Sequence, residues 1–69
     1  PEDRAEAGEW LRRGAEAGDA AAANLWGKAC YSASDIAEAE RWFRFAAEQG
    51  IAGGMVNLGI LLIEGRRQP

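Results

Sequence analysis

The chain has 69 residues, enough for one small domain, and its eight Lys and Arg against eleven Asp and Glu give a net charge of −3. That charge balance does not neutralise a run of phosphates, so we expect no nucleic-acid partner. The chain lacks histidine, the commonest metal ligand and the usual general base at neutral pH. We therefore expect no enzyme active site, no metal site and no cofactor.

The apolar run at 59–63, like every other in the sequence, is far too short to span a bilayer, so we expect no membrane insertion. The single cysteine cannot form an internal disulfide, so cysteine usage does not indicate an oxidising or a reducing compartment. The chain begins with Pro1 and shows no signal-peptide pattern. We expect residues 1–69 to be a segment of a longer chain from which any signal peptide has been lost, with a slight preference for the cytoplasm.

The first predicted helix covers residues 3–17, and Gly18, which suits a left-handed backbone, is predicted to end it. Residues three and four apart form its predicted inner face: Ala7, Trp10, Leu11 and Gly14. Asp19 is the predicted N-cap of a second helix, residues 20–32. The inner face of that helix has the same spacing: Ala23, Trp26, Gly27 and Cys30.

The third predicted helix covers residues 36–49, with Asp35 as N-cap, Glu38 at the spacing of a capping box and Gly50 at the end. Its inner face has two aromatic and two small residues: Ala39, Trp42, Phe43 and Ala46. The fourth helix is predicted over 52–64, with Gly65 as its end and 65–69 as a frayed tail. Its inner face has the same period: Met55, Leu58, Gly59 and Leu62.

The two halves of the chain match without a gap from residue 7 to residue 59 when one is shifted by 32 positions. The shift places Trp10 on Trp42, and it also aligns glycines and charged residues: Gly18 with Gly50, Gly27 with Gly59, Arg12 with Arg44 and Glu16 with Glu48. Such a period is typical of a helical solenoid. We expect the tryptophans, Trp10, Trp26 and Trp42, to fill the wedges between hairpins. We expect small residues to let helices approach closely: Gly14, Ala22, Gly27, Ala46 and Gly59.

The stretch AERWFRFAAEQG at 39–50 resembles the A-x-x-W-Y-R-K-A-A-E-Q-G signature of the Sel-1-like repeat family, a relative of the tetratricopeptide repeat. NLGILLIEG at 57–65 resembles the family's N-L-G-x-x-Y-x-x-G. In the weaker first copy, Trp26 replaces the Leu, Cys30 the Tyr and Ala33 the last Gly.

The resemblance implies an all-α fold of four helices, arranged as tandem αα-hairpins in a right-handed solenoid. By the family's phasing, the chain holds the closing helix of one repeat (3–17), a complete repeat (20–50) and the opening helix of the next (52–64). The resemblance also implies an adaptor role in assembling protein complexes.

The fourth helix has a second apolar stripe, which aligns with three residues of the second helix. In the tetratricopeptide-type arrangement these positions line a concave groove, and we predict that they bind a protein or peptide: Asn24, Lys28, Tyr31, Val56, Ile60 and Ile63. The alternative is a purely structural or self-association segment of a larger enzyme or regulator. In that case the stripe packs against the rest of a longer parent chain or within a homo-oligomer.

Two further features have expected structural explanations. Cys30 lies on an inner face and is predicted to be a buried, inert thiol. Three carboxylates stand at helical ion-pair spacing from arginines, which indicates solvated faces: Glu9 with Arg13, Glu38 with Arg41 and Glu40 with Arg44. Phe45 is a lesser candidate for an exposed contact, with packing against adjacent chain as the favoured explanation.

Overall fold

The computed structural model describes the backbone of residues 2–67 and the side chains of residues 8–65. The described residues form four helices and no strand: α1 (Glu2–Glu16), α2 (Ala20–Ser32), α3 (Ile36–Glu48) and α4 (Ala52–Arg67). The predicted all-α fold of four helices is confirmed. The helix bounds agree with the predicted ones to within one residue, except that α4 continues through Gly65 to Arg67, so Gly65 does not end it.

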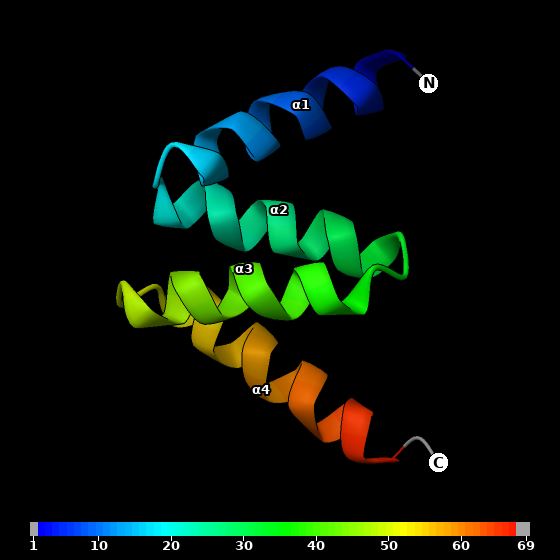
Figure 1. Ribbon diagram of the computed structural model, residues 1–69, viewed down its shortest axis with the longest axis vertical. Helices are drawn as coiled ribbons and strands as arrows, with labels where there is room; N and C mark the ends of the chain where they lie inside the picture. The colour runs from blue at the N-terminus through cyan, green and yellow to red at the C-terminus, as the bar shows by residue number, and fades with distance from the viewer. Residues whose placement is uncertain (1, 68–69) are drawn as a thin grey trace.

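The helices are stacked in chain order along the long axis of the molecule (Figure 1). Each helix packs against the next one in sequence, and α2 also touches α4. The Cα atoms span 35 × 28 × 14 Å, so the stack is thin. The middle helices α2 and α3 are therefore each covered on two sides by other helices, whereas α1 and α4 lie at the ends of the stack.

The turns after α1 and α3 are alike. Gly18 and Gly50 adopt left-handed φ values of 96° and 88°, as a helix C-terminus of this type requires. The next residue, Asp19, caps α2: its carboxylate accepts hydrogen bonds from the backbone N–H groups of Ala21 and Ala22 at 3.0 and 3.1 Å. The end predicted at Gly18 and the N-cap predicted at Asp19 are both confirmed.

The turn between α2 and α3 differs from the prediction. Asp35 occupies the N-cap position of α3, but its side chain makes no capping hydrogen bond, and Glu38 pairs instead with Arg41 at 3.4 Å. The predicted capping box is therefore wrong. Ser34, just before Asp35 in this short turn, has a left-handed φ of 66°. The backbone of Asp35 has a ψ of 76° and is less extended than that of Asp19, whose side chain caps α2 and whose ψ is 109°.

The core is centred on α2 and α3, and α1 and α4 add one buried side chain each, Ala15 and Leu61. It consists of small side chains around an aromatic pair: Ala15, Ala23, Cys30, Ala39, Trp42, Phe43, Ala46 and Leu61. Trp26, Phe45, Ile51 and Leu58 are partly buried against this group. The inner faces predicted for the second and third helices are thus confirmed.

Glycines, which have no side chain, lie where the helices approach each other most closely. A Cβ on Gly27 of α2 would lie 2.7 Å from the ring of Phe43 and 3.3 Å from the Cβ of Trp42. A Cβ on Gly14 of α1 would lie 2.8 Å from the Cβ of Ala22 on α2. Both distances are far below van der Waals contact, so the close approach predicted at these two glycines is confirmed.

The contact of α3 with α4 repeats that of α1 with α2, at positions 32 residues later in the sequence. A Cβ on Gly54 of α4 would lie 2.7 Å from the Cβ of Ala46 on α3. Ala46 and Gly54 are the counterparts of Gly14 and Ala22, with glycine and alanine exchanged between the two helices. The same close spacing is thus reached by either placement of the glycine.

Trp10 does not lie on an inner face. Its side chain is 74% exposed, whereas its counterpart Trp42 is 8% exposed. The predicted wedge role of Trp10 is therefore wrong. The physical reason is position in the stack: α3 packs between α2 and α4, whereas α1 lies at one end and packs on α2 (Figure 1).

The inner face predicted for α4 is also wrong in part. Leu58 is partly buried, but Met55 and Leu62 are 53% and 43% exposed. A Cβ on Gly59 would meet no other element of the described chain within 4 Å, so Gly59 makes no close approach. α4 is turned so that Gly54, which makes the close contact with α3, and Leu61 face inward.

Candidate functional site

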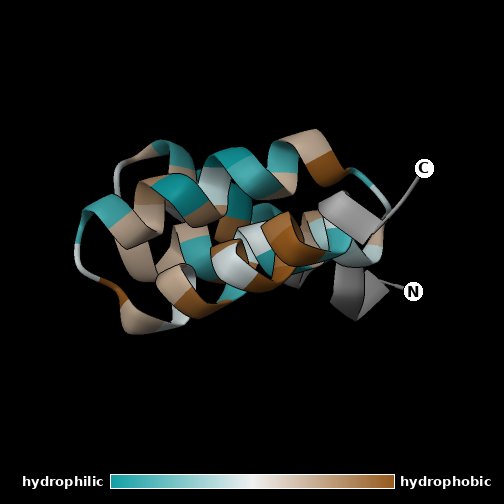
Figure 2. Ribbon diagram, turned by 90° about the horizontal axis from the view of Figure 1, so that it is seen from below, coloured by the Kyte–Doolittle hydropathy of each residue, from teal (hydrophilic) through white to brown (hydrophobic). Residues whose placement is uncertain are grey.

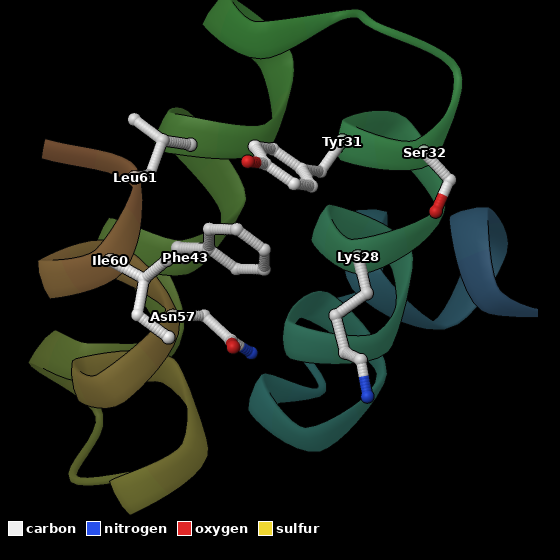
Figure 3. Close-up of a pocket in the computed structure, with 7 residues that line it drawn as sticks. All are labelled: Lys28, Tyr31, Ser32, Phe43, Asn57, Ile60 and Leu61. Atoms are coloured by element: carbon white, nitrogen blue, oxygen red, sulfur yellow. The ribbon is translucent and has the colours of Figure 1, made fainter. Parts of the chain in front are cut away.

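A hollow of about 230 Å³ lies between α2 and α4, with α3 behind it in the view of Figure 3. The α2–α4 hollow is lined by seven residues: Lys28, Tyr31, Ser32, Phe43, Asn57, Ile60 and Leu61. Phe43 comes from α3, and Figure 3 shows its ring between the residues of α2 and those of α4. Phe43, Ile60 and Leu61 give the hollow an apolar floor.

Two hydrogen bonds join α2 to α4 on either side of the hollow. The side-chain amide of Asn57 donates to Oδ1 of Asn24 at 2.9 Å, and the hydroxyl of Tyr31 donates to the carboxylate of Glu64. A Cβ on Gly53 would lie 2.8 Å from the Asn24 amide, so the backbone of α4 comes close to α2 here. These contacts hold the two walls of the hollow at a defined separation.

The six residues predicted to bind a partner fall into two groups. Lys28, Tyr31 and Ile60 line the hollow, and Asn24 makes the hydrogen bond at one end of it. Val56 and Ile63 are 60% and 59% exposed and do not line it. The predicted stripe of α4 therefore shares Ile60 with the hollow, whereas Val56 and Ile63 lie outside it.

Sequence reasoning missed the residues of α4 that face α2. Asn57 and Glu64 both bond to α2, and together with Ile60 they stand three and four residues apart. That spacing places them on one side of a helix, so a polar–apolar–polar stripe was the signal available in the sequence. Phe43 was assigned to the core, and it also forms the floor of the hollow.

The charge at the hollow comes from Lys28. Its side chain is exposed at the rim and forms no salt bridge within the described part of the chain. The carboxylate of Glu64, which is not among the residues that line the hollow, accepts a hydrogen bond from the Tyr31 hydroxyl. The rim therefore presents an ammonium group beside an apolar floor.

The predicted buried thiol is confirmed at Cys30, which is 6% exposed. Burial raises the pKa of the Cys30 thiol, and the negative charges of Asp35 and Glu38 raise it further. The thiol is therefore protonated at neutral pH, the form that is a poor nucleophile. Among the described residues no three Cys, Asp or Glu side chains are grouped so that they could hold a metal ion.

The carboxylates of the helix surfaces pair with arginines, as the sequence spacing predicts. The three predicted pairs have N–O distances between 2.7 and 3.4 Å: Glu9 with Arg13, Glu38 with Arg41 and Glu40 with Arg44. Arg12 also bonds to Glu9 and Glu16, and its guanidinium lowers the pKa of Glu9. Because these pairs are largely exposed to water, they contribute little to stability.

Phe45 lies on the side of α3 away from the α2–α4 hollow. It is partly buried and packs edge to face on Trp42, with the ring centroids 6.4 Å apart and the rings at 90°. A shallow depression surrounds it, lined by Ala37, Glu40, Arg41, Arg44, Phe45 and Glu48. Packing of Phe45 against adjacent chain, the favoured explanation, is what the structure shows.

Comparison with protein-family models gives no match, and neither the curated proteins nor the solved structures contain a match to this chain. None of the helices in the described part of the chain is both long and apolar enough to cross a membrane.

Proposed function

We propose that this chain is a non-catalytic scaffold that binds a segment of another protein in the α2–α4 hollow. The main support is a hollow with an apolar floor whose walls, on helices that are not consecutive in sequence, are joined by two side-chain hydrogen bonds. The resemblance of residues 39–50 and 57–65 to Sel-1-like repeats, which act as adaptors, agrees with this proposal.

The volume of the hollow favours a protein segment over a small molecule as its ligand. About 230 Å³ is below the roughly 300–1,000 Å³ of pockets for small molecules, and it suits one or two side chains of a protein segment. An apolar anchor side chain of the partner would rest on Phe43 and Ile60. An acidic residue next to the anchor would pair with the ammonium of Lys28 at the rim. Because the walls are already joined, binding would order few groups of the scaffold.

Selection from a displayed peptide library tests this proposal. We expect selected peptides to share an apolar residue beside Asp or Glu and to lose affinity about tenfold or more for Ile60→Glu. Ile63→Glu is the matched control, since Ile63 is a similarly exposed isoleucine of α4 outside the hollow. Lys28→Gln should weaken binding and remove its salt dependence. Equal losses for the two isoleucine variants, or no binding peptide, would count against the proposal.

A second candidate function is structural: the chain would be a self-association module or a repeat segment that packs within a larger protein. The observation that favours it is the apolar outer side of α4, where Met55, Val56 and Ile63 are more than half exposed. Single exposed apolar residues are ordinary, but a contiguous group on one helix indicates a contact surface.

A further inference from the structure

The outer side of α4 is apolar along its whole described length. Figure 2 looks at the molecule from the α4 side and shows this helix mostly in brown and white. We define the α4 face by its exposed residues and the glycine among them: Met55, Val56, Gly59, Leu62 and Ile63. No charged side chain of the described chain belongs to it. The centre of this face is Gly59, where the helix backbone is bare.

The other end of the stack carries the largest exposed aromatic side chain among the described residues. Trp10 on α1 is 74% exposed, and its neighbour Leu11 is half-buried. Trp10 and Gly59 therefore lie on opposite ends of the row of helices (Figure 1). Trp10 is mostly exposed, and a Cβ on Gly59 would meet no other element of the described chain within 4 Å.

The contact of α2 with α3 shows how these two surfaces fit. There, Gly27 on α2 accepts the ring of Phe43, and Trp42 packs beside it with its Cβ close to the same glycine. By the 32-residue repeat, Gly59 on α4 corresponds to Gly27 on α2. Leu11 and Trp10 on α1 correspond to Phe43 and Trp42 on α3. The α4 face and the outer side of α1 thus carry the two halves of an interface that the molecule already forms once.

We propose that a second copy of this chain docks its α1 on the α4 face of the first, repeating the packing of α3 on α2. Leu11 of the arriving copy would lie over Gly59, as Phe43 lies over Gly27, and Trp10 would pack beside it on the α4 face and be buried there. The proposal specifies the second candidate function, on which it rests, and it leaves the α2–α4 hollow free.

The geometry of such a contact is head to tail. The docking surface and the docked surface lie on different ends of the molecule, so each added copy again exposes an α4 face. An interface of this kind does not close on itself unless the rotation happens to form a ring. The chain should therefore assemble into rows of increasing length, and a symmetric dimer is not expected.

Sedimentation equilibrium of the 69-residue chain tests the assembly. The weight-average mass should rise steadily above the 7.4 kDa of one copy over about a hundredfold range of concentration, from micromolar to millimolar. Trp10→Ser and Gly59→Gln should each remain at the mass of one copy. Both positions are open in the structure, so far-ultraviolet circular dichroism should show that both variants keep their helices. Leu25→Ser, at an exposed leucine of α2, is the matched control and should assemble like the parent.

Mixing the two variants distinguishes a head-to-tail contact from every symmetric one. Trp10→Ser keeps an intact α4 face, and Gly59→Gln keeps an intact α1 surface, so an equimolar mixture should form a pair of two copies and stop there. Ile60→Glu, which alters the hollow, should assemble normally, so failure of peptide binding and failure of assembly are told apart. A parent chain that stays at one copy, a mass that levels off at two copies, or a mixture that stays at one copy would overturn the proposal.

Discussion

At the scale of single residues, the same residue type has opposite roles at matched positions. Gly27 is the point where α2 and α3 come closest, because a Cβ there would overlap the ring of Phe43. Gly59, 32 positions later, faces open space. The sequence alone predicts the same contact at both glycines, since it shows the period but not which helix faces are covered. The difference is set by the neighbouring helix, which Gly27 has and Gly59 lacks.

We therefore expect alanine substitutions at these two glycines to change the free energy of unfolding in opposite directions. Gly27→Ala should lower the free energy of unfolding by about 1–2 kcal/mol, because overpacking against Phe43 outweighs the better helix propensity of alanine. Gly59→Ala should raise it by about 0.5–1 kcal/mol, since only the propensity changes. Urea unfolding at micromolar concentration, followed by circular dichroism, measures both values. Shifts of the same sign in the two variants would contradict this account.

Cys30 provides a prediction about pH. Because burial and two nearby carboxylates raise the pKa of the thiol, the folded state favours the protonated form. This contribution to stability is complete below the pKa of the unfolded thiol and is lost as the pH rises through the higher folded pKa. Thiol-reagent labelling of the folded chain at pH 8 should be about tenfold or more slower than in urea. Asp35→Asn should lower the folded pKa in part; an unchanged labelling profile would argue against that charge effect.

At the scale of the helix, α2 and α3 begin with the same residue type in different geometry. Asp19 accepts two backbone N–H groups of α2, whereas the Asp35 carboxylate accepts none from α3. The sequence predicts both aspartates as caps from their position before an apolar period. It does not show the left-handed Ser34, which accompanies the less extended backbone of Asp35 in the short turn before α3.

Replacing each aspartate by alanine measures this difference. Asp19→Ala should cost about 1 kcal/mol of stability, the usual value for loss of an N-cap hydrogen bond. Asp35→Ala should cost less than about 0.5 kcal/mol, because it removes only the favourable charge near the start of α3. Urea midpoints at pH 7 give both numbers, and equal losses would mean that the geometric difference has no energetic effect.

The helices also show how far an inner face can be predicted. On α2 and α3 the apolar and small residues recur on one side, and the buried side is the predicted one. α4 is apolar around most of its circumference, so periodicity does not choose a side. The close contact of Gly54 with Ala46 fixes which side of α4 faces α3, and Met55 and Leu62 therefore point outward. The same orientation brings Asn57 and Glu64 to α2 and leaves Val56 and Ile63 outside the hollow.

At the scale of the whole molecule, stability depends on the α2–α3 pair. Trp42 is 8% exposed, its Cβ lies against Gly27, and Phe45 packs on its ring. Its indole N–H is buried without a hydrogen-bond partner among the described residues, so Trp42 stabilises the fold through packing and through the Arg41 guanidinium, which lies 4.9 Å from its ring centroid. A thin stack of four helices has few other large buried side chains to compensate for its loss.

We expect Trp42→Ala to cost roughly 3–5 kcal/mol, enough to unfold a chain of this size. Trp10→Ala is the matched control and should leave the thermal midpoint nearly unchanged at micromolar concentration, since Trp10 is mostly exposed. Thermal unfolding followed by circular dichroism measures both variants. A midpoint of Trp42→Ala within a degree or two of the parent would contradict the central role of this residue.

The number and order of the helices were predictable because α1, α2 and α3 each end at a glycine or a polar turn and each helix has its own apolar period. The ends of the stack were not predictable, because burial of Trp10 and Gly59 requires a further helix that the described chain does not supply. The hollow was predictable in part: the sequence pointed to Lys28, Tyr31 and Ile60. It did not show that Phe43 would be its floor.

The linear order of contacts has a consequence for how the chain folds. Because helices pack chiefly on their sequence neighbours, most contacts close only short loops and lose little chain entropy. Chains with such local contacts fold in microseconds to milliseconds. The α2–α3 hairpin, which contains most of the buried side chains, is the expected nucleus, and α1 and α4 then add to it independently. Temperature-jump relaxation should accordingly show a lower folding rate for destabilising variants in this hairpin, whereas such variants in the two outer helices should mainly raise the unfolding rate.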